Sequence, residues 1–334
     1  MYTHIEDNIY TIPVPLPNNP LRQLNSYVIK GEGRSLVIDT GFKLEECRKA
    51  LCDGLEELGV DMNCTDIFLT HLHSDHSGLA AELATQSSKI YISRADGELL
   101  TLSLTQGLGR VEEYRSYGFS EKELENFWEN PSMKYRQESP FNFTYVADGD
   151  VLTYGGRRLE VIFTPGHTPG HVCLYDRANK VMFLGDHVLF NITPNITTWP
   201  FFEDPLGHYV HSLMDISIYD VRLPLPAHRG VNGTMAERIG TIIEHHGARI
   251  REMLDILTER PGLTPYDLSG MMTWRVHGKT NSWADFPLNQ KWFAVGETAA
   301  HLDYLLKRGR VRREFDGRCW HCLLYTSDAA DDLI

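Results

Sequence analysis

The sequence predicts a mixed α/β fold followed by a small, mainly helical unit, and three observations support this prediction. Along roughly the first 230 residues, short β-rich runs alternate with helical patterns and are joined by polar or glycine-containing turns. From Thr234 onward the pattern changes to long helices. With 334 residues, of which 42% are hydrophobic and 23% charged, the chain can bury a large core and a smaller one, and it lacks the composition of a disordered protein.

The first part of the chain contains ten runs that are predicted to be strands, because β-branched, aromatic and aliphatic residues are concentrated in them. One amphipathic helix is predicted over Leu44–Leu58, where Leu44, Cys47, Leu51 and Leu55 share one face. The predicted strands are Asn8–Ile12, Asn25–Lys30, Ser35–Asp39, Asp66–Leu69, Lys89–Ser93, Phe143–Val146, Arg157–Phe163, Val172–Asp176, Val181–Gly185 and Val221–Pro224.

A helix-prone insertion, residues 94–142, separates two of these strands. An excursion of this length often forms a wall or a lid over a cleft, whereas a peripheral decoration is the alternative interpretation. Both interpretations remain open at this point.

The C-terminal part is predicted to be a small winged-helix-like unit, in which helices are followed by a β-hairpin. Thr264 is a predicted helix cap, because a proline at the first helical position and an acid three residues after the cap follow it. The hairpin is expected around the turn Asp316-Gly317. The predicted elements are the helices Met235–Thr258 and Asn289–Arg308, a helix opening at Thr264, and the strands Arg310–Phe315 and Arg318–Leu323.

The last residues, 322–334, fit neither a strand nor a helix well. They resemble the read-through of a sequencing adapter, so we expect a non-native tail that lies outside the fold.

Charge, cysteines and hydropathy restrict the environment of the chain. The net charge is −13, from 45 acidic and 32 basic residues, so nucleic acid would be repelled unless a local basic patch binds it. The six cysteines are sparse and irregularly spaced, which is typical of reduced thiols. The N-terminus has no signal-peptide pattern, and no apolar run is long enough to cross a bilayer. We therefore expect a cytoplasmic protein without a membrane partner.

The strongest functional signal is the segment Thr70-His71-Leu-His73-Ser-Asp75-His76-Ser-Gly78, directly after a predicted strand. Imidazole and carboxylate groups are the ligands that zinc and similar divalent ions take in proteins. The alternative is a polar loop of hydrogen-bonded histidines. It is disfavoured, because three potentially cationic rings packed together without a metal repel one another.

Three further segments place a histidine or aspartate after a predicted strand. They contain His167 in Thr164-Pro-Gly-His167, Asp186 in Phe183-Leu-Gly-Asp186, and His228 in Leu225-Pro-Ala-His228. Each segment alone is a weak signal. Four such segments in this order are a strong one, because the ends of strands at one edge of a fold can assemble a shared site.

The order His-x-His-x-Asp-His, then His, Asp and His, resembles the metallo-β-lactamase superfamily over about residues 5–232, most closely its glyoxalase-II-like branch. The resemblance implies a four-layer αββα sandwich as the catalytic domain, residues 1–232, followed by the winged-helix-like unit, residues 233–321. It also implies that one cation is held by His71, His73 and His167, that a second is held by Asp75, His76 and His228, and that Asp186 bridges the two.

Asp39, in Val37-Ile-Asp39-Thr-Gly41, matches the aspartate that follows the family's first strand. The resemblance implies that its carboxylate orients a ligand histidine from behind. A turn-forming aspartate before Gly41 is an alternative that does not exclude this role.

Several other histidines are interpreted as structural. His171 is expected to be a hydrogen-bonding residue beside its turn, and His187 to point away from the cations because successive side chains of an extended segment alternate. His245 and His246 lie on a predicted long helix, where a structural or solvated role is favoured over one at the site.

The implied chemistry is hydrolysis. A divalent cation lowers the pKa of bound water from about 16 to about 7, and two cations can share the resulting hydroxide. Asp75 would bind this hydroxide and transfer its proton, and Asp186 would hold the two cations together. The cofactors are predicted to be two divalent metal ions, zinc first, with iron and manganese as alternatives.

The predicted function is cleavage of a thioester, ester or lactone in a small-molecule substrate. The aspartate at the bridging position argues against an exported antibiotic-degrading lactamase. The glutathione-contacting C-terminal region of glyoxalase II is not recognisable in the sequence, which argues against hydroxyacylglutathione as the substrate. The alternative is a lactamase-like endoribonuclease or phosphodiesterase whose winged helix binds single-stranded RNA.

A basic run, Lys307-Arg308-Gly-Arg310-Val-Arg312-Arg313, supports that alternative and a nucleic-acid-binding protein as a competing class. A solvated face offset by Glu314 and Asp316 is the favoured interpretation of this run. The same helices also fit a dimerisation module, so a homodimer is a further alternative.

Overall fold

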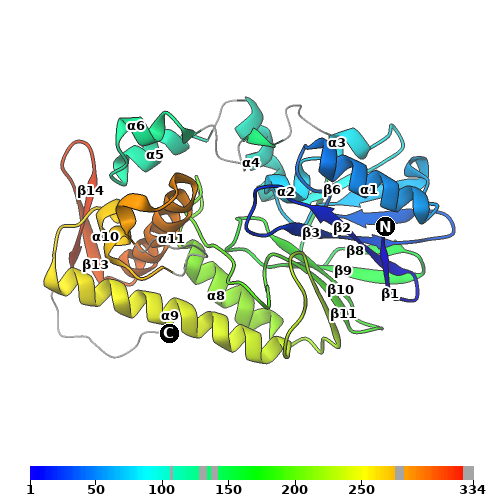
Figure 1. Ribbon diagram of the computed structural model, residues 1–334. Coiled ribbons are helices and arrows are strands. Elements are labelled where there is room, and N and C mark those ends of the chain that lie inside the picture. The colour runs from blue at the N-terminus through cyan, green and yellow to red at the C-terminus, as the bar shows by residue number, and fades with distance from the viewer. Residues whose placement is uncertain (106–107, 128–133, 137–141, 275–281, 326–334) are drawn as a thin grey trace. The chain divides into compact units, whose positions relative to one another are not determined.

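A computed structural model describes residues 1–105, 108–127, 134–136, 142–274 and 282–325 of the chain (Figure 1). Within these residues the chain forms two compact units. The first comprises Met1–Leu108, Pro131–Pro194 and Ser212–Arg238, and the second comprises Gly109–Asn130, Asn195–His211 and Ile239–Ile334. Residues 109–130 and 195–211, which the sequence analysis assigned to the first domain, thus group with the C-terminal unit. The boundary after residue 232 stays a prediction.

The first unit contains two sheets. In the seven-stranded sheet the order follows the sequence, β1 to β7, with antiparallel pairing from β1 to β4 and parallel pairing from β4 to β7. Its strands are β1 Thr3–Glu6, β2 Ile9–Pro15, β3 Gln23–Ile29, β4 Ser35–Ile38, β5 Thr65–Phe68, β6 Ile90–Ser93 and β7 Phe143–Val146. Because β4, β5 and β6 are parallel, the segments that follow them emerge at the same edge of the sheet.

The five-stranded sheet has the order β12-β11-β10-β9-β8. All of its pairs are antiparallel except β11 with β12, which is parallel. Its strands are β8 Val151–Tyr154, β9 Arg157–Phe163, β10 Val172–Asp176, β11 Val181–Gly185 and β12 Leu223–Pro226.

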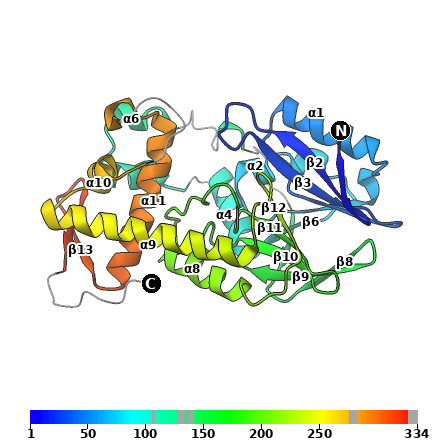
Figure 2. The same cartoon turned by 60° about the horizontal axis from the view of Figure 1, so that its bottom comes forward.

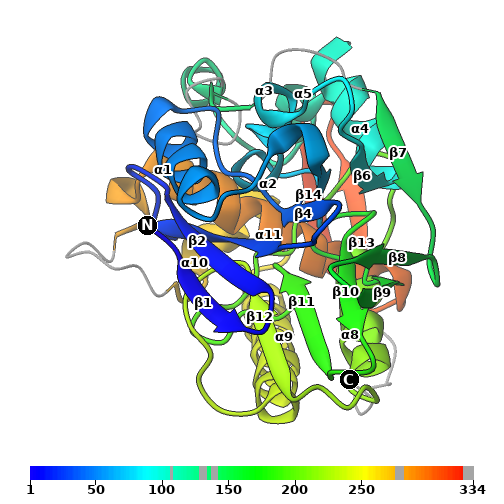
Figure 3. The same ribbon diagram turned by 90° about the vertical axis from the view of Figure 1, so that its right-hand side faces the viewer.

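The two sheets pack face to face, and α1 (Glu45–Glu57) covers the outer face of the first (Figure 3). Successive side chains of a strand point to opposite faces of the sheet and so belong to two different hydrophobic cores. Leu36 and Ile38 of β4 belong to the core between the sheets, whereas Val37 belongs to the core that includes Leu51 and Leu55 of α1. Each of these fully buried side chains contributes about 1.5–3 kcal/mol to stability. The observed architecture is the predicted mixed α/β sandwich.

The short helices of the first unit lie next to strand ends. They are η1 (Met62–Cys64), α2 (Ser74–Ser77), α3 (Ala80–Leu83) and α4 (Arg94–Thr105). Helix α8 (Pro205–Ile216) begins in the second unit and ends in the first. In the first unit, the Ser212 hydroxyl donates to the Pro165 carbonyl at 2.9 Å.

The second unit combines helices with a two-stranded hairpin (Figure 2). Its core is aromatic, since Trp292 stacks on Phe119 with ring centroids 4.3 Å apart and meets Tyr114 edge-on at 4.6 Å. Its elements are α5 (Arg110–Ser116), α6 (Glu121–Leu124), most of α9 (Met235–Glu259), α10 (Pro265–Met271), η3 (Trp283–Asp285), α11 (Leu288–Lys307), β13 (Val311–Phe315) and β14 (Trp320–Leu324).

A local sequence signal accounts for the start of α10. The Thr264 hydroxyl accepts from the Asp267 amide and Pro265 begins α10, which confirms the predicted cap. Strands β1 and β8 were not among the predicted strands. The predicted tail is corrected at its start, since Cys322–Leu324 belong to β14 and Cys322 is buried against Leu263. Residues 326–334 lie outside the described residues.

Gly185, the last residue of β11, has a left-handed backbone with φ of 50°, and a Cβ there would lie 2.6 Å from the His171 Nε2 atom. We expect Gly185→Ala to lower the free energy of unfolding by about 2–5 kcal/mol, through backbone strain plus overlap with His171 and Thr70. Gly156→Ala is the control, because Gly156 has φ of 76° but open space around it. Equal losses for both variants in urea unfolding would contradict the steric argument.

Candidate metal centre

The segments that follow β5, β9, β11 and β12 meet at one edge of the two-sheet sandwich and bring together every residue proposed as a metal ligand. In the first cluster the His73 Nδ1 atom lies 2.9 Å from the His71 Nε2 atom and 3.0 Å from the His167 Nε2 atom. These three ligand atoms lie within 4.8 Å of one another. Because His71 and His73 follow β5 whereas His167 follows β9, the two sheets each contribute to this cluster.

A second cluster is formed by Asp75, His76 and His228. The His228 Nε2 atom lies 3.3 Å from the His76 Nε2 atom and 3.3 Å from the Asp75 Oδ2 atom. Asp75 and His76 belong to α2, the short helix after β5, and His228 follows β12. The first and last ligand segments of the predicted domain therefore meet here.

Asp186, directly after β11, lies between the two clusters. Its Oδ2 atom is 3.6 Å from the His167 Nε2 atom, whereas its Oδ1 atom is 3.4 Å from the His228 Nε2 atom. The buried Oδ1 atom accepts no hydrogen bond from any residue that the structure describes. A buried carboxylate oxygen without a hydrogen bond is costly unless another electropositive group meets it.

These residues fit divalent cations. Two nitrogens that each bind one tetrahedral zinc at about 2.0–2.1 Å lie about 3.3 Å apart, which is close to the separations of 2.9–3.3 Å between the facing imidazole nitrogens. The donor set of imidazoles and carboxylates and the Asp186 Oδ1 atom point to the same conclusion.

The electrostatics of the two clusters differ. Burial, followed by the neighbouring histidines, lowers the pKa of His71 well below its usual value, and burial with the nearby His167 lowers the pKa of His73 to about 3. For His76, burial opposes protonation, but Asp39 and Asp186 outweigh it and raise its pKa well above the usual value. Burial therefore favours the neutral, metal-binding form of His71 and His73, whereas the neighbouring carboxylates favour protonation of His76.

Asp39 follows β4 and has a left-handed backbone with φ of 60°. Its Oδ2 atom lies 2.8 Å from the His76 Nδ1 atom, and its carboxylate accepts hydrogen bonds from the Thr70 amide at 2.9 Å and the Thr70 hydroxyl at 2.8 Å. The contact with His76 has the geometry that the predicted orienting role of Asp39 requires. His228 is oriented in a similar way, because its Nδ1 atom lies 2.8 Å from the Gln23 carbonyl oxygen, a backbone partner that sequence patterns do not reveal.

The remaining histidines also have defined places. The Nδ1 atom of buried His171 lies 2.8 Å from the Thr164 hydroxyl, and its Nε2 atom accepts from the Asp186 amide at 3.1 Å, so it is the structural hydrogen-bonding residue that was predicted. His187 is buried and is not in either cluster among the described residues. His245 and His246 belong to α9 in the second unit, where the His246 Nδ1 atom lies 3.0 Å from the His301 Nε2 atom.

Comparisons with known proteins agree with this geometry. The family model described as "Metallo-beta-lactamase superfamily" matches residues 19–237. A metallo-beta-lactamase family protein from Thermus thermophilus is similar with a TM-score of 0.79 and 28% identity, over 95% of this chain and 98% of that one. A beta-lactamase domain protein from Burkholderia ambifaria has a TM-score of 0.79 at 22% identity, over 97% and 93% of the two chains, which shows the fold alone.

Among curated relatives, the lactamase-like protein aptB of Emericella nidulans is 25% identical over 74% of this chain and 67% of its own length. The lactamase-like protein nscB of Arthroderma benhamiae is 25% identical over 77% of this chain, but the match spans only 48% of that protein. The fold and the site define a metal-dependent hydrolase. The chain belongs to the metallo-beta-lactamase superfamily.

Among the described residues, the structure contains no helix that is both long and apolar enough to cross a membrane.

Replacing the Asp39 carboxylate by an amide should weaken cation binding at the cluster of Asp75, His76 and His228. We expect Asp39→Asn to lower that affinity about 10–100-fold, because the acceptor that faces the His76 Nδ1 atom loses its negative charge. Titration of metal-stripped protein with zinc or cobalt measures this affinity. Asp7→Asn is the control, since Asp7 also has a left-handed backbone, with φ of 42°, and pairs with Arg157. Unchanged affinity in Asp39→Asn would contradict the orienting role.

Proposed function

We propose that the chain is a dinuclear metal-dependent hydrolase that cleaves a thioester, ester or lactone bond in a small-molecule substrate. The observation that carries this proposal is the position of Asp186, which directs Oδ2 toward His167 and Oδ1 toward His76 and His228. A carboxylate placed in this way can be shared by two cations. The proposed ligands are His71, His73 and His167 for one cation, Asp75, His76 and His228 for the other, and Asp186 for both.

Zinc is the proposed metal, because its tetrahedral sites use histidine and aspartate ligands, and iron and manganese accept the same set. When bound, the two cations would supply a water activated at neutral pH and positive charge for the oxygen of the scissile carbonyl. The chain itself must then orient the ligands and move a proton. Asp75 is proposed for the proton, because its side chain, 12% exposed, is more accessible than that of Asp186, 8% exposed.

The charges of the second unit favour an acyl substrate over RNA. The Lys307 ammonium pairs with Glu203 at 2.6 Å, and the Arg308 guanidinium pairs with Asp204 at 2.9 Å. Arg312 is paired with Glu314, and Arg313 lies over the Trp320 ring at 4.6 Å. Three of the five cations in the basic run are thus paired with a carboxylate of the same unit. Combined with the net charge of −13, this leaves little positive charge to attract a polyanion.

Changing Arg310, Arg312 and Arg313 together to alanine should leave turnover of an acyl substrate within about twofold of the parent chain, since these residues contribute to the hairpin and not to the metal centre. Steady-state kinetics on the best thioester or lactone measure this. Salt-dependent binding of short single-stranded RNA by the parent chain, lost in the triple variant together with phosphodiester cleavage, would favour the endoribonuclease instead.

The decisive test is a panel of thioesters, esters, lactones, phosphodiesters and short RNA on metal-quantified protein. We expect about two metal equivalents per chain, and at least a 100-fold loss of kcat for Asp75→Ala and His228→Ala, since each removes a ligand of the second cation. Chelation should abolish turnover and readdition of zinc should restore it.

Asp215→Ala and His211→Ala are matched controls for that panel, because both residues are exposed on α8. Both variants should turn over like the parent chain. Parental turnover in Asp75→Ala and His228→Ala, or a metal content near zero after supplementation, would overturn the proposal.

A further inference from the structure

A buried carboxylate outside the proposed ligand set joins the two loops that supply the first cluster. Asp96 lies in the first turn of α4, and it is fully buried. Its Oδ2 atom accepts hydrogen bonds from the Leu72 amide at 2.9 Å and from the Thr168 hydroxyl at 2.7 Å. Its Oδ1 atom accepts from the Gly170 amide at 2.7 Å. A single side chain thus receives three hydrogen bonds from two separate segments.

These two segments carry the three histidines of the first cluster. Leu72 lies between His71 and His73 in the loop after β5, whereas Thr168 follows His167 in the loop between β9 and β10. One loop therefore leaves the first sheet and the other belongs to the second. The His73 and His167 ring nitrogens approach to 3.0 Å across this junction.

Gly170 provides independent evidence that this junction is closely fitted. A Cβ atom at Gly170 would lie 2.1 Å from the Ser93 hydroxyl oxygen and 2.7 Å from the Asp96 backbone nitrogen. Only glycine lets the backbone approach Asp96 closely enough for its amide to donate. The glycine of Thr168-Pro-Gly170-His171 thus has a physical function that the sequence pattern alone did not reveal.

We infer that Asp96 is a positioning residue that holds His71, His73 and His167 in the arrangement that binds the first cation. This inference rests on the proposed function, in which these three histidines bind metal. An ionised carboxylate is suited to the task, since charged acceptors form hydrogen bonds about twice as strong as neutral ones. Although burial raises the pKa of Asp96 to about 6, the group is still mainly ionised at neutral pH.

The position of Asp96 makes its effect selective. Leu72 and Thr168 each adjoin a histidine of the first cluster, whereas the second cluster is oriented by Asp39 through His76 and by the Gln23 carbonyl through His228. Loss of the Asp96 carboxylate should therefore lower the affinity for the first cation and leave the affinity for the second unchanged. A general loss of stability would affect both.

The test compares cation binding by the full chain and its variants after metal removal, with cobalt titration followed by absorption and with zinc in competition with a chromophoric chelator. We expect Asp96→Asn to lower the affinity for one of the two cations about 10–100-fold and to leave the affinity for the other within about threefold of the parent value. One component of the cobalt absorption spectrum should be lost. Thr168→Val removes one hydrogen bond without changing shape, and about a 3–10-fold weakening of the same cation is expected.

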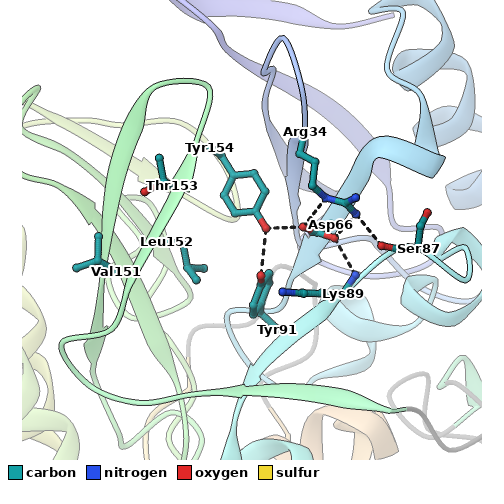
Figure 4. A pocket seen from close by; sticks show the side chains of 9 residues that line it. All are labelled: Arg34, Asp66, Ser87, Lys89, Tyr91, Val151, Leu152, Thr153 and Tyr154. Carbon is teal, nitrogen blue, oxygen red and sulfur yellow. Dashed lines mark hydrogen bonds and ion pairs between the residues drawn. The ribbon is translucent and has the colours of Figure 1, made fainter.

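Asp66→Asn is the matched control, because Asp66 is another buried aspartate with several partners (Figure 4). It accepts from the Arg34 guanidinium at 2.5 and 2.9 Å, from the Tyr154 hydroxyl at 2.5 Å and from the Lys89 amide at 2.8 Å. It lies near the start of β5, about 13 Å along the chain from Thr70. Its loss should destabilise the fold while both cation affinities stay within about threefold of the parent values.

The outcomes separate the two proposals. If the parent chain binds fewer than two cations, the proposed function fails. If the parent binds two and both Asp96→Asn and Thr168→Val bind them with parental affinities, only the positioning role fails. The positioning role would also be overturned if Asp96→Asn and Asp66→Asn each lowered the affinities for both cations equally, since that pattern indicates general destabilisation. If Asp96→Asn does not fold, the Thr168→Val titration decides.

Discussion

The structure of the first unit depends on bringing imidazoles and carboxylates from four separated segments into one buried cluster. Burial of such groups is unfavourable by several kilocalories per mole for each charge that has no partner. The clusters reduce this cost because every acid faces a histidine, as Asp186 faces His167, His76 and His228. Divalent cations bound here would balance the remaining negative charge, so metal binding and folding of this edge of the sheets are expected to be coupled.

Much of this site was predictable because its signals are local. The four ligand residues after β5 lie within six positions of one another, and His167, Asp186 and His228 each follow an apolar run that reads as a strand. Since strand ends collect at the edges of a sheet, the order of the motifs was enough to predict that they meet. Most strands and α1 were predictable for a similar reason, because hydrophobic periodicity is a property of short windows, whereas the pairing of the two sheets was implied by the family resemblance.

The parts that were not predicted depend on distant partners. Asp96 contacts residues 24 to 74 positions away, and nothing in its own segment distinguishes it from an ordinary acid in the first turn of a helix. The basic run was ambiguous for the same reason, because Glu203 and Asp204 are 104 positions from the cations that they pair with. The grouping of residues 109–130 with the C-terminal unit depends on aromatic contacts such as that of Phe119 with Trp292.

The order of strands explains why two aspartates outside the ligand set are needed. β5 lies between β4 and β6 and is parallel to both, so the segments after all three strands emerge at one edge. Asp39 follows β4 and reaches Thr70 and His76, while Asp96 follows β6 and reaches Leu72. The loop after β5 is therefore held by carboxylates that follow both neighbouring strands. Asp39 contacts His76 directly, whereas Asp96 contacts residues beside the histidines of the first cluster, so the two carboxylates are expected to affect the two proposed cation sites to different degrees.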